Sequence, residues 1–125
     1  MLQQILSLQG ALWTTHANDQ NTVLSRLEML IAQEFSVSIL QLRSKTRGLA
    51  RVARARQIAM YMAHVALGFS LSNLAKYFGR DRTTITHACN LIEDARDERR
   101  FDEQLNTLEE KLLALVPQAK WQVAP

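Results

Sequence analysis

The chain has 125 residues, of which 47% are hydrophobic, so it has room for one compact domain and little more. Its single cysteine, Cys89, excludes an internal disulfide and a cysteine-rich zinc cluster, and we expect neither a metal nor a cofactor. The N-terminal residues are too short an apolar stretch to span a bilayer and lack a basic start, so the sequence predicts a cytoplasmic protein without a membrane anchor.

Basic charge is concentrated in the middle of the chain. Residues 35–82 carry nine cations and one acid, a net charge of +8, whereas residues 1–34 carry −2 and residues 83–125 carry −3. A polyanion would be attracted to the centre and repelled by both ends, which indicates a central partner surface.

The spacing of apolar residues predicts helices throughout, beginning with a short helix over residues 1–17 that ends in a turn at Asn18–Asn21. Thr22 then caps a helix, and a short helix follows over residues 39–42. A long helix is expected over residues 51–66, ended by Gly68. The apolar stripes of the two longer helices are Val23, Leu27, Leu30 and Ile31, and Val52, Ile58, Met62 and Val65.

A helix-turn-helix is expected next. Ser70 caps a brief helix that Gly79 closes, and Asp81 caps a second helix. The buried stripe of the second helix is Ile85, Ala88, Ile92 and Ala95. A last helix over residues 102–115 packs Leu105, Leu108, Leu112 and Leu115 inward, which completes an all-α fold of about five to six helices.

The stretch Phe78–Ala88, FGRDRTTITHA, places polar residues at the start of the second helix. The face opposite the buried stripe carries Thr83, Thr86, His87 and Asn90, and its acids follow only from Asp94 onward. Such a helix can enter the major groove of DNA with its N-terminal turns. The alternative is that Asp81 and its neighbours form only a cap and a solvated first turn.

A second basic feature is the run RSKTRGLARVARAR, residues 43–56, which holds six cations and no acid. Runs of this kind are often only a solvated face. Here Gly48 makes part of the run a flexible loop, and a basic loop beside a helix-turn-helix can place an arginine in the minor groove. Both features therefore favour double-stranded DNA as the partner.

Residues 44–94, from SKTRGLARVARARQIAM through GRDRTTITHACNLIED, resemble the C-terminal DNA-binding domain of the bacterial replication initiator DnaA. The resemblance extends over roughly residues 22–115. It implies that the basic loop enters the minor groove and that the recognition helix reads a short DNA box. The residues that it implies for the loop are Lys45, Arg47, Arg51 and Arg54, those for phosphate are Arg56, Gln57, Ser70 and Lys76, and those for bases are Asp81, Arg82, Thr83 and Thr84. Arg80 in the turn and His87 on the exposed face complete the predicted DNA-binding set.

The sequence also departs from that family. Arg82 stands where the family usually has histidine, the turn at Gly79 is one residue shorter, and Asn90 and Leu91 replace an expected basic pair. The DNA sequence bound therefore does not follow from the resemblance. No GxxxxGK[ST] run occurs in the chain, so we expect no ATPase activity.

The sequence bears on three functions other than the one proposed from the basic segment. An enzyme is not expected, because the three histidines are scattered and no nucleophile elbow or HExxH run occurs. A protein-interaction module that occupies regulators of the replication initiator remains the alternative, with the acidic stretch Glu93–Lys111 as its surface. A transcription role at the same kind of site also stays open. The expected organisation is an N-terminal extension over residues 1–21, the DNA-binding domain over residues 22–116 and a loose tail over residues 117–125.

Overall fold

The computed structural model describes residues 16–45 and 48–115, and all regular structure within these ranges is helical. This confirms the predicted all-α class. The elements are α2 (His16–Phe35), α3 (Ile39–Arg43), α4 (Ala50–Tyr61), the π-helical turn η1 (Met62–Ala66), α5 (Leu71–Phe78), α6 (Arg82–Ala95) and α7 (Arg99–Leu115).

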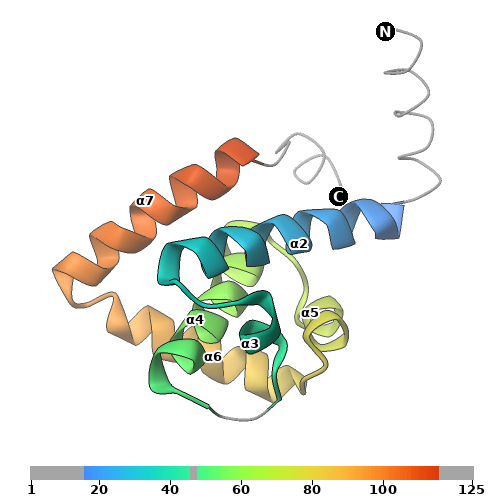
Figure 1. Cartoon of the computed structure of the whole chain (residues 1–125), viewed down its shortest axis with the longest axis horizontal. Coiled ribbons are helices and arrows are strands. Elements are labelled where there is room, and N and C mark those ends of the chain that lie inside the picture. The colour runs from blue at the N-terminus through green and yellow to red at the C-terminus, as the bar shows by residue number, and fades with distance from the viewer. Residues whose placement is uncertain (1–15, 46–47, 116–125) are drawn as a thin grey trace, which may run out of the picture.

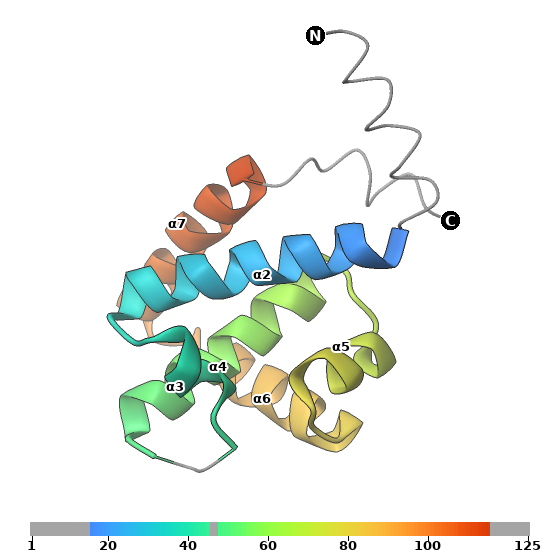
Figure 2. The same cartoon turned by 45° about the vertical axis from the view of Figure 1, so that its right-hand side comes forward.

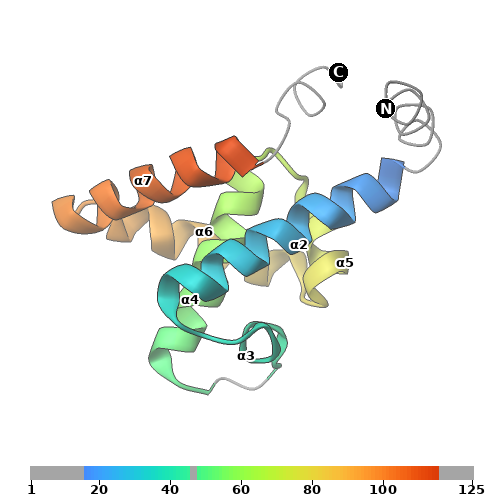
Figure 3. The same cartoon turned by 45° about the horizontal axis from the view of Figure 1, so that its top comes forward.

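Helix α4 lies at the centre and packs against α2, α3 and α6 (Figure 1). Helices α5 and α6 form the helix-turn-helix, in which α6 packs against α4 and α5 contacts α6 and η1, as the rotated view shows (Figure 2). Helix α7 lies beside α2 (Figure 3), where Lys111 pairs with Glu34 at 3.1 Å and the Arg26 guanidinium donates to the Leu115 carbonyl at 3.2 Å. The fully buried side chains that join these helices include Leu27, Ile31, Ile58, Leu74, Ile85, Ile92, Leu105 and Leu112.

The local signals around α5 are confirmed. The Ser70 hydroxyl accepts a hydrogen bond from the Asn73 amide at 3.1 Å and so caps the helix. Gly79 ends the helix at φ 65°, in the left-handed region that glycine adopts without a steric penalty. The two caps fix where the helix-turn-helix begins and where its turn lies.

The start of α2 differs from the prediction. The turn expected at Asn18–Asn21 and the cap expected at Thr22 are wrong, because α2 runs without a break from His16. Asparagine and aspartate oppose a helix only weakly, and extending an existing helix adds one backbone hydrogen bond per residue fixed. Of the short helix predicted over residues 1–17, residues 1–15 lie outside the described residues, and residues 16–17 belong to α2. The domain boundaries stay a prediction.

The long central helix is confirmed, with one correction. It continues past Tyr61 as the π-helical turn, and Gly68 follows it at φ 79°. Val65, expected in the buried stripe, is 49% exposed, and it lies inside the wider π turn, whose residues do not keep the α-helical register on which the prediction was based.

In α7 the predicted leucine stripe is confirmed at Leu105, Leu108 and Leu112. The prediction that Leu115 packs in the core is wrong. Leu115 is the last residue of the helix, and its side chain is 47% exposed. Cys89 is buried as expected, and this burial raises the pKa of its thiol.

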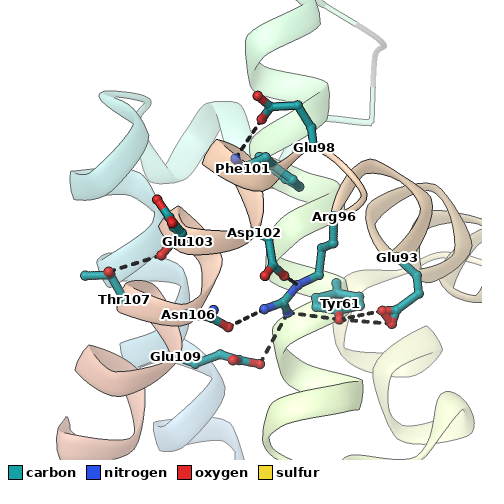
Figure 4. Close-up of polar contacts among 10 residues, drawn as sticks. All are labelled: Tyr61, Glu93, Arg96, Glu98, Phe101, Asp102, Glu103, Asn106, Thr107 and Glu109. Carbon is teal, nitrogen blue, oxygen red and sulfur yellow. Dashed lines mark hydrogen bonds and ion pairs between the residues drawn. The ribbon is translucent and has the colours of Figure 1, made fainter.

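Arg96, at the end of α6, holds α7 against the rest of the fold (Figure 4). Its guanidinium donates to the Asp102 carboxylate, to the Asn106 side-chain oxygen and to the Tyr61 hydroxyl, and it lies 3.6 Å from Glu109. Burial alone would lower the pKa of Arg96, but these partners leave it raised. Two acidic side chains of α7, Asp102 and Glu109, are thus engaged by Arg96 within the chain.

Candidate nucleic-acid interface

The helix-turn-helix presents the first turns of α6 to solvent. Arg82, Thr83, Thr84 and His87 are all exposed, while Ile85 faces the core between them. A helix N-terminus leaves amides without intrahelical partners and carries the positive end of the helix dipole. The polar face predicted from the sequence is therefore present on the surface.

Asp81 occupies the N-cap position of α6, as predicted, with an extended backbone conformation. Its side chain accepts no hydrogen bond from the first turn of the helix. The carboxylate is exposed and stands beside Arg82, so it is available to accept from an external donor such as a base amine.

The predicted basic-loop residues have different surroundings. Lys45 is exposed, and its Cε and Nζ lie 3.7 Å from the position that a Cβ on Gly79 would occupy. Arg51 is exposed and donates to the Ser36 carbonyl at 3.0 Å, beyond the end of α2. Arg54 stacks over the ring of Phe101 at 5.6 Å. Arg47 lies outside the described residues.

Arg56 and Arg80 bind main-chain carbonyls at the end of α3. Arg56 is 7% exposed, and its Nε and Nη2 donate to the carbonyls of Leu42 and Gln41 at 2.9 and 2.8 Å. Arg80 donates from Nη2 to the carbonyl of Ser44 at 2.7 Å. Burial, and then the charge of Arg80, lower the pKa of Arg56. The sequence predicted a phosphate contact for Arg56, but the structure engages its guanidinium internally.

A hollow of about 320 Å³ joins the root of the basic loop to α6. Its polar lining combines cations with neutral donors and includes no acid. The polar residues that line it are Lys45, Arg56, Gln57, Arg80, Thr84 and His87. The structure thus brings together, on one side, side chains that the sequence places in three separate segments.

Two further predicted phosphate ligands lie on or beside α5. Lys76 is exposed in its last turn and lines a second hollow together with Lys45 and Arg80. Ser70 is exposed, and its hydroxyl oxygen already accepts the Asn73 amide, so its proton remains for an outside acceptor.

The sequence reasoning missed Glu28, a carboxylate that is 1% exposed. It accepts from Arg43 Nη2 at 2.7 Å and from the Tyr77 hydroxyl at 2.8 Å, and so ties α2 to α3 and α5. Its position offered a signal, because Glu28 falls between Leu24 and Ile31 on the apolar side of α2.

Within the described residues no helix has the length and apolar character to cross a membrane, and no group of three metal-binding side chains is present.

Comparison with known proteins gives concordant results. The family described as bacterial dnaA protein helix-turn-helix matches residues 25–92. The chromosomal replication initiator protein DnaA of Psychromonas ingrahamii is 36% identical over 80 residues, which are 63% of this chain and 17% of that protein. The chain thus corresponds to less than a fifth of the length of this relative.

Two solved structures are similar in fold. One, a crystal structure of a DNA replication initiation factor, superposes with a TM-score of 0.77 at 22% identity and covers 93% of this chain and 38% of that chain. The other, replication initiator DnaA bound to AMPPCP and single-stranded DNA, gives 0.68 at 26% identity over 86% of this chain and 33% of that chain. Since the family match spans more than half of the residues, the chain belongs to the bacterial DnaA helix-turn-helix family.

Proposed function

We propose that this domain binds double-stranded DNA sequence-specifically, with the start of α6 in the major groove and the basic loop in the minor groove. The observation that carries the proposal is the first turn of α6, which exposes Arg82, Thr83 and Thr84 at a helix N-terminus where the Asp81 side chain makes no cap hydrogen bond. Side chains at this place in a helix-turn-helix reach base edges, while the amides receive a phosphate.

The two reading elements lie on one side of the molecule. The end of α3, where the basic loop begins, lies near the turn before α6 in both views (Figures 1 and 2). Arg80 in that turn donates to the Ser44 carbonyl and so joins the two segments. One duplex can therefore meet α6 and the loop together, which would place the loop in the minor groove beside the major groove that α6 enters.

The preferred site is expected to be related to replication-initiator boxes but altered at one base. Arg82 is exposed at the first position of α6, where the resembling family usually has histidine. Arginine can donate two parallel hydrogen bonds to guanine O6 and N7, which a histidine cannot. We therefore expect guanine opposite Arg82, and a role in regulating replication or transcription through competition for related sites.

Anisotropy of a labelled duplex, measured at several salt concentrations, tests the proposal. Several phosphate contacts would make log affinity fall with log salt at about −0.9 per contact, so six contacts give a slope of about −5. Lys76→Ala should reduce the slope by about one and weaken all sequences alike, whereas Arg82→Ala should relax preference at one base by about 1–3 kcal/mol.

Absence of binding at low salt, or an affinity that does not change with salt, would refute DNA binding. A protein that bound no duplex but captured a purified regulator of the replication initiator would instead support the protein-interaction alternative. The salt dependence separates the two functions, because only DNA binding releases counterions from DNA.

A further inference from the structure

We infer that Arg80 is a positioning residue, which holds the root of the basic loop at a fixed place relative to the recognition helix and thereby couples the reading of the two grooves. The inference rests on the proposed two-groove binding. It assigns to Arg80 a different task from the DNA contact that the sequence predicts for it.

The geometry around Arg80 supports a structural bond rather than an outward-facing cation. Its Nη2 donates to the Ser44 carbonyl at 2.7 Å, and Ser44 is the C-cap residue of α3, the first position of the loop. Arg80 itself is half-buried in the turn between α5 and α6, one residue after Gly79. The bond thus spans 36 residues of sequence and links the two DNA-reading elements directly.

Other contacts hold α3 against α4 and α2. Arg56 binds the carbonyls of Gln41 and Leu42, and the Arg43 side chain is paired with buried Glu28. The carbonyls at the end of a helix lack intrahelical donors, and cations there also interact favourably with the helix dipole. Among these attachments, only that of Arg80 comes from the turn that precedes the recognition helix.

Arg82, two residues further on, supplies a matched contrast. It carries the same charge as Arg80 but is exposed at the first position of α6. A variant of Arg82 therefore changes charge and base contact without removing the bond to Ser44. Arg80→Ala removes that bond and leaves the first turn of α6 intact.

The first arm of the experiment uses the whole chain without DNA. Hydrogen–deuterium exchange at the Ser44 amide, which donates to the Gln41 carbonyl at 3.2 Å, reports on order at the loop root. Loss of a hydrogen bond from a charged donor should speed this exchange about tenfold in Arg80→Ala. Exchange at Ser44 should be unchanged in Arg82→Ala. Equal exchange in wild type and Arg80→Ala would overturn the inference.

The second arm measures affinity for four duplexes, which combine a selected or scrambled box with A·T-rich or G·C-rich flanks. The wild type should prefer A·T-rich flanks, where a narrow minor groove attracts an inserted arginine. In Arg80→Ala the flank ratio should fall toward one while the box preference is kept, and Arg82→Ala should show the reverse. If Arg80→Ala weakens all four duplexes by one factor, Arg80 is a phosphate ligand and the inference fails. If the wild type has no flank preference, the minor-groove part of the proposed function fails, and the exchange arm still decides whether Arg80 orders the loop.

Discussion

The buried carboxylate of Glu28 leads to a stability prediction in which a second mutation restores stability that the first mutation removes. Arg43 pairs with it at 2.7 Å, but the two side chains differ in environment, with 54% of Arg43 and only 2% of Glu28 exposed. Arg43→Met keeps an aliphatic chain over Glu28 and removes the cation, so the carboxylate stays buried with the Tyr77 hydroxyl as its remaining partner. We expect a large loss of stability, because water cannot reach the buried Glu28 carboxylate to solvate it in place of the missing guanidinium.

Breaking a buried ion pair by removing one partner lowers the free energy of unfolding by roughly 3–5 kcal/mol. Because Glu28 keeps its hydrogen bond from Tyr77, we expect a loss of about 3 kcal/mol here. Adding Glu28→Gln to Arg43→Met should then restore stability, because an amide keeps the shape and the acceptor for Tyr77 without a buried charge. The second mutation is thus expected to rescue the first.

Urea unfolding followed by circular dichroism measures this. With a slope of about 1–3 kcal/mol per molar urea for a small domain, Arg43→Met should lower the midpoint by about 1–3 M, and the double variant should recover part of that shift. Glu28→Gln alone serves as the control and should cost less than Arg43→Met, since the guanidinium that it leaves is half in water. A double variant less stable than Arg43→Met alone would refute the reasoning.

Three further outcomes are expected. Arg82→His should move the preferred base opposite this residue away from guanine, as measured by selection from a random duplex pool, and identical selected sites would mean that Arg82 contacts only phosphate. Ser70→Ala removes the cap of α5 and should lower the free energy of unfolding by about 1 kcal/mol in urea titrations, whereas Ser70→Gly should lower it less. Burial, together with the bond to Glu28, raises the pKa of Tyr77 to about 12, above the ordinary 10.0, so its contribution to stability is complete below pH 10 and is lost as the pH rises toward 12. The decline in stability over that range should be smaller in Tyr77→Phe, and equal declines would contradict the assignment.

Local sequence signals determined much of the fold and the exposed part of the site. Ser70 and Gly79 set the ends of α5 because a hydroxyl cap and a left-handed glycine act within a few residues. The stripe of Ile85, Ala88 and Ile92 fixed which side of α6 is buried, and therefore which side carries Arg82. Helix caps and helical periodicity depend only on residues that are close in sequence, so they can be predicted without the tertiary structure. The cap predicted at Thr22 was wrong because the helix continues through that residue. The burial predicted for Val65 was wrong because α-helical periodicity does not hold in the π turn.

Tertiary structure alone decided which cations face outward. The sequence predicts a DNA contact for each of Arg56, Arg80 and Arg82, yet packing buries the first, bonds the second to Ser44 and leaves the third exposed. It also decided that Glu28 is buried, because its two partners come from α3 and α5. The physical reason is that a guanidinium binds whatever acceptor the fold brings within about 3 Å, and these carbonyls and carboxylates lie many residues away along the chain.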